Sequence, residues 1–154
     1  MTPAVEAARR AGIAFELHTY DGVEVGDGDY AVAVAERLGI EPARLLKTLV
    51  ASVDGALQVF VLPADEHLDL HATGKRAVLA DRAQAERATG YVVGGISPLG
   101  QRRALPTTVD LGALAHGTVL VSAGRRGLQM ELDPNELVRL THAQTRTIVR
   151  HPNG

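Results

Sequence analysis

The feature that most constrains the fold is a pair of apolar runs joined by a two-residue turn. LLKTLVASV, residues 45–53, and ALQVFVLP, residues 56–63, flank Asp54 and Gly55. An Asp-Gly pair favours the tight turn whose backbone twist matches that of two antiparallel strands. We therefore predict a β-hairpin, and any fold for this chain has to place a sheet around it.

Helices and further strands are predicted on both sides of this hairpin. Thr2 and Pro3 are typical of a helix start and Gly12 of a helix end, so residues 2–12 are expected to be helical. Helices are also predicted over 30–39 and 134–143 and as two short pieces within 68–90, and strands over 13–20, 91–95, 107–110, 117–124, 127–133 and the tail 146–154. The mixture predicts one α+β domain over 1–154, with a twisted, mostly antiparallel or mixed sheet flanked by short helices.

Composition narrows the function classes. The chain has no cysteine, which excludes disulfides, thiolate zinc sites and a thiol nucleophile from the protein. It contains no apolar run of the roughly 18–20 residues that span a bilayer, and its N-terminus lacks a signal-peptide core, so we expect a cytoplasmic protein without a membrane partner. A net charge of −2 argues against non-specific binding of nucleic acid by the whole surface. Five basic residues could still converge to form a local basic face. These are Lys47, Arg102, Arg103, Arg125 and Arg126.

Two glycine-rich connections are the main candidates for a binding site. In YVVGGISPLGQRR, residues 91–103, Gly95 and Gly100 are spaced as in a phosphate loop, but Gln101 stands where that loop needs lysine. Such a segment is either a turn that needs glycine or a wall on which a ligand lies directly against backbone. The second connection is SAGRRG, residues 122–127, and it can be interpreted in the same two ways. It is either a turn with solvated arginines or a ligand site whose arginines contact phosphate.

Other polar residues suggest weaker alternatives. Lys47 alternates with Leu45 and Leu49 in its predicted strand, so it is either a solvated cation or the charge of an apolar pocket. His67 and His71 would share one face of a helix, but Asp69 fits better as a helix N-cap, and no second cluster completes a metal shell. We expect no metal and no cofactor.

YVVGGISPLGQRRALPTTVD, LLKTLV and VSAGRRGLQMEL, in their spacing, resemble the YbaK/EbsC family of aminoacyl-tRNA deacylases and prolyl-tRNA synthetase editing domains. The resemblance covers nearly the whole chain and is strongest to the free-standing Cys-tRNA(Pro) deacylases. It implies a mixed α/β domain around a twisted sheet, and an enzyme that hydrolyses the ester between a wrong amino acid and the 3′ end of tRNA(Pro). The acceptor end of the tRNA is then a partner, and prolyl-tRNA synthetase a second one.

The resemblance also implies a set of site residues. Lys47 would hold the terminal adenosine or its phosphate, and Gly95, Ser97 and Gly100 would form the catalytic wall. The substrate-binding residues would be Tyr20, Tyr30, Thr48, Gly94, Ser122, Gly124 and Gln129. The family mechanism uses the thiol of a cysteinyl substrate to attack its own carbonyl, which releases the tRNA.

One position departs from the Cys-specific branch. Gln129 stands where that branch has an aspartate tied to recognition of the aminoacyl group, and an amide can form a hydrogen bond but not an ion pair. The alternatives are therefore a deacylase for Ala-tRNA(Pro) or another small amino acid, and a non-catalytic module that binds tRNA or prolyl-tRNA synthetase.

Overall fold

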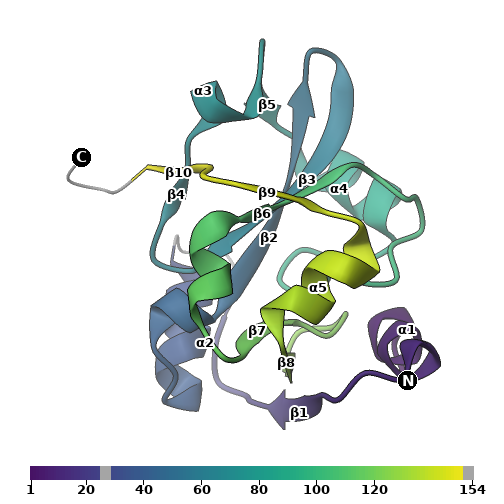
Figure 1. Ribbon diagram of the computed structural model, residues 1–154, viewed down its shortest axis with the longest axis vertical. Coiled ribbons are helices and arrows are strands. Elements are labelled where there is room, and N and C mark those ends of the chain that lie inside the picture. Colours follow the sequence, from purple (N-terminus) through teal and green to yellow (C-terminus); the bar gives the residue numbers. More distant parts are fainter. Residues whose placement is uncertain (25–28, 151–154) are drawn as a thin grey trace.

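The computed structural model describes residues 1–24 and 29–150 (Figure 1). Its strands are β1 (Glu16–Thr19), β2 (Leu46–Val53), β3 (Ala56–Pro63), β4 (His67–Leu68), β5 (Val78–Leu79), β6 (Thr107–Asp110), β7 (Val119–Ser122), β8 (Leu128–Leu132), β9 (Gln144–Arg146) and β10 (Val149–Arg150). Its α-helices are α1 (Pro3–Ala11), α2 (Tyr30–Leu38), α3 (Leu70–Thr73), α4 (Arg82–Thr89) and α5 (Pro134–Thr141), and Pro42–Arg44 and Leu111–Ala115 form 3-10 turns.

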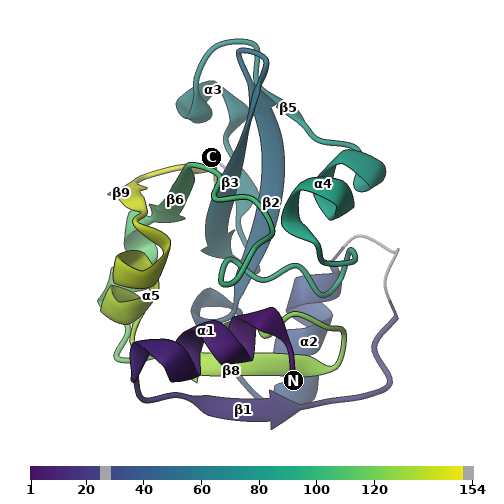
Figure 2. The same cartoon turned by 90° about the vertical axis from the view of Figure 1, so that its right-hand side faces the viewer.

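The strands form three sheets. A mixed sheet has the order β5-β2-β3-β6-β9, in which β3, β6 and β9 run parallel and β2 pairs antiparallel with both of its neighbours. An antiparallel sheet has the order β1-β8-β7, and β10 pairs with β4. Figure 2 shows the long β2–β3 hairpin standing above β1 and β8, which run across its base. A single parallel bridge between Leu45 and Leu120 joins the two larger sheets.

The hairpin forms as its turn sequence predicts. Val53 pairs with Ala56, so Asp54 and Gly55 make a two-residue turn with positive φ at both residues. This confirms the predicted hairpin and its turn, and every residue of β2 has a partner in β3.

The helix ends follow ordinary capping chemistry. Thr2 caps α1 by accepting the Val5 N–H and also donates its hydroxyl proton to the carbonyl of Ala123, which ties α1 to the end of β7. Asp81 caps α4 in a reciprocal arrangement with Gln84. Asp69 caps α3 through the His71 N–H at 3.1 Å, as predicted.

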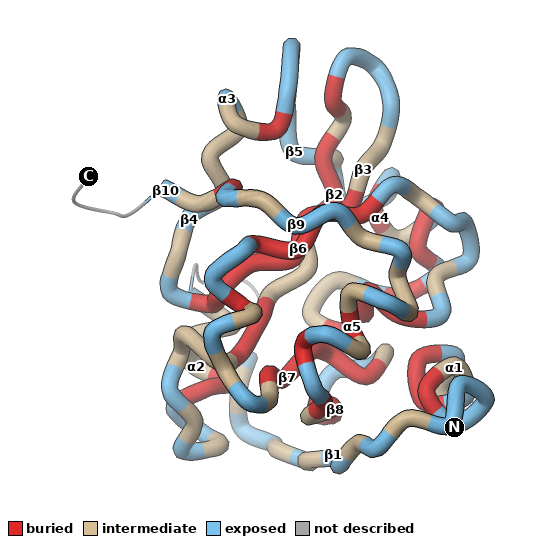
Figure 3. The backbone as a smooth tube through the Cα atoms, in the orientation of Figure 1, coloured by how far each residue is buried: buried red, intermediate tan, exposed pale blue. Residues whose placement is uncertain are grey.

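The main core lies between the two larger sheets and is closed by α1 and α5. Fully buried members include Ala8 of α1, Val59 of β3, Met130 of β8 and Leu137 of α5. Figure 3 shows the buried residues following the central strands, whereas the hairpin tip and β5 are exposed. A second cluster holds α2 against Leu45 and Leu120, so α2 is fixed beside the start of β2.

The structure is α+β, as the sequence predicts, with one element in error. Residues 91–95 form turns instead of a strand, because local hydrogen bonds satisfy their backbone. The Val93 N–H donates to the Glu86 carboxylate at 2.7 Å, and the Gly95 N–H donates to the Val92 carbonyl at 2.8 Å. Of the predicted tail strand 146–154, only Arg146 in β9 and Val149–Arg150 in β10 are in strands, and residues 151–154 lie outside the described part. No helix within the described ranges is long and apolar enough to cross a membrane.

Candidate functional site

A pocket of about 460 Å³ lies along the first half of β2. Its walls come from α2, α4, the segment after α4 and the paired ends of β7 and β8. Most of the lining is apolar, with a few polar groups at separate points, which is the usual composition of a small-molecule site. The polar and charged members are Tyr30, Lys47, Thr48, Arg82, Ser122 and Gln129.

The backbone of β2 contributes to this wall. β5 pairs with β2 only at Ala51 and Ser52, near the hairpin tip. Successive residues of an antiparallel strand direct their backbone groups to alternate edges. The Val50 carbonyl accepts the Ala80 N–H at 2.9 Å on the side away from β3, so Thr48, two residues earlier, directs its N–H and carbonyl to that same edge. Among the described residues no strand pairs with Thr48 there, so its backbone groups are available to a ligand.

Lys47 places a cation in this apolar surrounding. It is half-buried, and its Nζ donates to the Ala64 carbonyl at 3.3 Å. Burial lowers the pKa of Lys47 from its ordinary value, and the nearby carboxylates of Asp29, Asp65 and Glu66 partly oppose that shift. A partly desolvated ammonium interacts more strongly with an anion than one in bulk water does.

Two tyrosines form a pair at the α2 side of the pocket. The hydroxyls of Tyr20 and Tyr30 lie 2.9 Å apart, and Tyr30 lines the pocket. Burial and the hydrogen bond to Tyr20 raise the pKa of Tyr30, so its hydroxyl stays protonated at neutral pH. Tyr20 itself does not line this pocket and borders a separate hollow next to Asp21 and Arg37.

Two side-chain oxygens at the pocket wall have no hydrogen-bond partner within the described chain. They are Oγ1 of Thr48 and Oε1 of Gln129, and both atoms are buried. Gln129 is only 4% exposed, so its carbonyl cannot be satisfied by bulk solvent. Leaving such a group without a partner costs about 1–3 kcal/mol, which a ligand with a hydrogen-bond donor would recover. Ser122, opposite Gln129 in the strand pairing, also lines the pocket.

The glycines of the predicted catalytic wall serve chain packing in this structure. A Cβ atom on Gly95 would lie 2.7 Å from the Cα atom of Arg125, and one on Gly100 would lie 2.6 Å from the carbonyl oxygen of Pro3. Both distances are below any normal contact, so each glycine allows two backbone segments to touch. Gly124 similarly packs against Tyr91. Of the predicted glycines, Gly94 is the one that lines the pocket.

Ser97 does not reach the pocket either. It is fully buried, and its Oγ accepts the Leu99 N–H at 3.2 Å. The hydroxyl of Tyr91 donates to the Leu99 carbonyl at 2.7 Å from within the same loop. These bonds give residues 91–101 a fixed shape, and the neighbouring Ile96 is the residue that faces the pocket.

Sequence reasoning missed the wall supplied by α4. Arg82 and Ala85 of this helix line the pocket together with Leu79 of β5. Arg82 also lies 3.4 Å from the Glu86 carboxylate, so it stands at the rim as part of an ion pair. The Arg82–Glu86 spacing is visible in the sequence, but nothing in it shows which cavity the helix borders.

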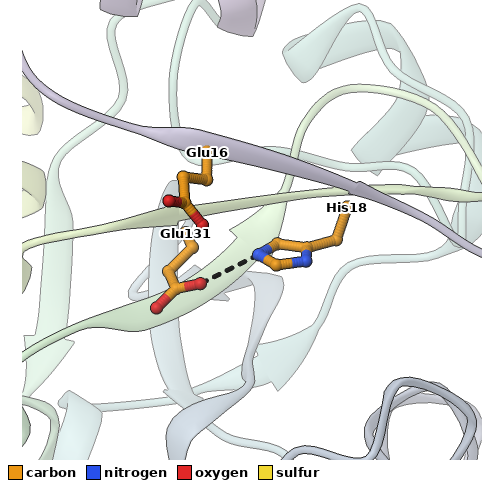
Figure 4. A group of neighbouring side chains, drawn as sticks. All are labelled: Glu16, His18 and Glu131. Carbon is orange, nitrogen blue, oxygen red and sulfur yellow. Dashed lines mark hydrogen bonds and ion pairs between the residues drawn. The ribbon is translucent and has the colours of Figure 1, made fainter.

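Figure 4 shows Glu16, His18 and Glu131 together on the three-stranded sheet, where neighbouring side chains satisfy the Glu131 carboxylate. His18 lies 2.8 Å from one oxygen of Glu131, and the other oxygen accepts from Arg44 at 3.2 Å and from Thr118. Glu16 completes the group. The hydrogen bonds and the Arg44 cation lower the pKa of Glu131, with the Thr118 bond the largest cause. An arginine on the shared carboxylate makes this cluster a poor cation site.

His67 and His71 lie in different elements, β4 and α3, so the shared helical face considered for a metal pair does not form.

The chain is similar to one known protein family and to several known proteins. The family model of the aminoacyl-tRNA editing domain matches residues 26–140. A protein of Enterococcus faecalis, named as the candidate Cys-tRNA(Pro)/Cys-tRNA(Cys) deacylase EbsC, is 40% identical over 121 residues, which are 74% of this chain and 73% of that protein.

Solved structures share the fold. Hypothetical protein APE2540 is 25% identical, and the match covers 96% of this chain and 99% of that one with a TM-score of 0.84. A candidate trans-editing enzyme for prolyl-tRNA synthetase is 22% identical, with coverage of 97% and 99% and a TM-score of 0.78. At this identity the second match shows the fold alone.

Proposed function

The chain belongs to the aminoacyl-tRNA editing domain family, that of YbaK and EbsC, and is an aminoacyl-tRNA deacylase; we propose that it removes cysteine from Cys-tRNA(Pro). One observation carries the proposal. One pocket holds the Lys47 ammonium together with the Thr48 and Gln129 side-chain oxygens, which have no partner among the described residues, in a chain 40% identical to a protein named for Cys-tRNA deacylation.

The polar points of the pocket suggest how an aminoacyl ester would be held. The Lys47 ammonium attracts the terminal adenosine's phosphate, and the backbone of Thr48 offers an N–H to the ester carbonyl. Gln129 Oε1 and Thr48 Oγ1 accept hydrogen bonds from the amino group. We propose this arrangement in place of the backbone amides of residues 95–100, because the Gly95 N–H already donates to Val92 and the Leu99 N–H to Ser97.

With a cysteinyl ester the reaction needs no nucleophile from the protein. The substrate sulfur bonds to the carbonyl carbon, the bond to the 3′ oxygen of the ribose breaks, and that oxygen takes the thiol proton. A thiol pKa near 8.5 leaves a few per cent of thiolate at neutral pH, which suffices for an attack within one bound molecule. The role of the pocket is to hold the ester in the reacting conformation.

A panel of charged tRNAs tests this substrate. We expect rapid deacylation of Cys-tRNA(Pro) and turnover at least about 10-fold slower on Ala-tRNA(Pro), which lacks the internal nucleophile. The measurement is single-turnover release of labelled amino acid, with Pro-tRNA(Pro) as the control. Preference for alanine would identify the rival deacylase, and binding of all three without release would identify a non-catalytic module.

Replacing Gln129 tests recognition of the amino group. A hydrogen bond to a charged group contributes about 1.5–3 kcal/mol, so Gln129→Leu is expected to raise KM for Cys-tRNA(Pro) about 10-fold. Thermal stability should not fall, because the replacement removes a buried oxygen that has no partner within the described chain.

The matched measurement uses N-acetyl-cysteinyl-tRNA(Pro), which has no ammonium group. Wild type and Gln129→Leu should have similar KM values on this substrate, and Gln129→Glu should recover binding of the free amine. An equal rise in KM on both substrates would show that Gln129 shapes the pocket and does not contact the amine.

We further propose that residues 1–154 act as one editing domain on the acceptor end of tRNA, with prolyl-tRNA synthetase as a second partner. In support of one domain, α1 lies outside the matched range 26–140 but contributes three buried residues to the main core.

A further inference from the structure

Arginines are concentrated in one part of an otherwise acidic chain. Residues 82–130 contain six arginines against two acidic residues, while the whole chain has a net charge of −2. These arginines are all exposed, and we call them the arginine rim: Arg82, Arg87, Arg102, Arg103, Arg125 and Arg126.

The segment after α4 places two of them against the end of that helix. The Arg102 N–H donates to the Thr89 carbonyl at 2.9 Å and the Arg103 N–H donates to the Ala88 carbonyl at 3.3 Å, so this pair lies against the end of α4. The same helix carries Arg82 at its start and Arg87 in its last turn.

The β7–β8 connection adds the remaining two. Gly95 packs directly on the backbone of Arg125, as its missing Cβ shows. Arg126 Nε donates to the Val93 carbonyl at 2.8 Å. Arg126 also lies close enough to Tyr30 for its charge to lower the pKa of that tyrosine, against the larger effects of burial and Tyr20. Because Tyr30 and Val93 line the pocket, Arg126 stands at its mouth.

Lys47, in contrast to the arginine rim, has acidic residues around it. Burial lowers the pKa of Lys47, and the carboxylates of Asp29, Asp65 and Glu66 act on its ammonium and oppose part of that shift. A polyanion leaving the pocket on that side would meet like charge, whereas on the side of α4 it would meet the rim.

We propose that the arginine rim binds the phosphates of the RNA strand adjoining the nucleotide in the pocket, so that the acceptor end leaves over Arg126 and α4. The inference rests on the proposed function for the presence of a nucleotide in the pocket. Exposed arginines around a pocket mouth suit phosphate oxygens, because each guanidinium presents several donors in a fixed plane.

The test measures binding of an uncharged RNA hairpin with the acceptor-stem sequence of tRNA(Pro) and an unpaired CCA end. The variant Arg103→Gln/Arg125→Gln removes two rim charges whose side chains form no hydrogen bond within the described chain. We expect the hairpin to bind roughly 10-fold more weakly at low salt. The slope of log K against log salt should become shallower by about 0.7 per lost single-strand phosphate contact, or about 1.4 in all.

A matched variant removes the same charge elsewhere. Arg139→Gln/Arg150→Gln changes two exposed arginines on α5 and β10, and Figure 2 shows α5 on the opposite side of the molecule from α4. This control should bind the hairpin like wild type. If both variants weaken hairpin binding equally, or if neither variant weakens it, the proposal that the rim binds RNA is wrong. It is also wrong if the rim variant loses binding to prolyl-tRNA synthetase while its hairpin binding is unchanged.

The RNA in this test carries no amino acid, so its result does not depend on catalysis. Weaker hairpin binding by the rim variant, in a protein that releases no amino acid from any charged tRNA, would leave the rim standing and overturn the deacylase. If the wild-type protein deacylates a charged tRNA and the rim variant binds the hairpin as wild type does, the proposed function stands and the rim proposal is wrong.

Discussion

The variant Lys47→Ala is expected to lose about 100- to 1,000-fold in kcat/KM for deacylation while the chain stays folded. Removing one partner of a desolvated charge pair typically costs about 2–5 kcal/mol, which spans this range, and the partner removed here is the cation proposed to hold the substrate phosphate. Lys47 is half-buried, and burial already lowers its pKa, so its ammonium acts in a medium where charge interactions are strong. Deacylation of Cys-tRNA(Pro) under single-turnover conditions measures the loss.

The chain provides a matched control for this experiment. It contains two lysines, and Lys75 is exposed in the loop after α3. Lys75→Ala removes the same charge and should retain wild-type kcat/KM and wild-type thermal stability. Lys47→Arg keeps the positive charge and should recover part of the activity. Normal turnover by Lys47→Ala would remove Lys47 from the site, and a large drop in its melting temperature would show a structural role instead.

The variant Gly95→Ala is expected to lower the free energy of unfolding by about 2 kcal/mol. Its new methyl group would lie 2.7 Å from the Cα atom of Arg125 and 2.9 Å from the next backbone atoms, so two loops have to separate. Overpacking of this kind typically costs about 1–3 kcal/mol. For a chain of this length about 2 kcal/mol corresponds to a melting temperature lower by roughly 4–8 °C, measurable by calorimetry.

Gly117→Ala is the control, because a Cβ atom there has no neighbour within 4 Å and the backbone does not need glycine. That variant should match or slightly exceed wild-type stability. We also expect Gly95→Ala to raise KM, since Gly94 beside it lines the pocket. Unchanged stability in Gly95→Ala would mean that the 91–101 loop moves freely over the 122–127 loop.

The sequence predicts the local structure well where one residue type decides it. Asp54 and Gly55 set the hairpin register, Thr2 and Pro3 start α1, and Asp69 caps a short helix, all as predicted. Residues 91–95 were predicted to be a strand from their apolar side chains. The prediction is wrong because Glu86, a residue of the preceding helix, binds the Val93 N–H.

The site residues that the family resemblance implies on strands lie together. Lys47, Thr48, Ser122 and Gln129 all line one pocket, and Tyr30 joins them from α2. The glycines were harder to interpret. Glycine at positions 95 and 100 indicates that a side chain would not fit there, but not whether a ligand or another stretch of backbone occupies the space. Here Arg125 and Pro3, both distant in sequence, occupy that room.

The incomplete pairing of β2 has a consequence for solubility. An unpaired strand edge ordinarily invites a strand from another molecule, which is a common start of aggregation. Here the edge near Thr48 lies inside a pocket bordered by α2 and α4, and β5 covers the part nearer the hairpin tip. With helices on both sides the edge is covered, so the backbone that would hold substrate is kept from pairing with a strand of another molecule.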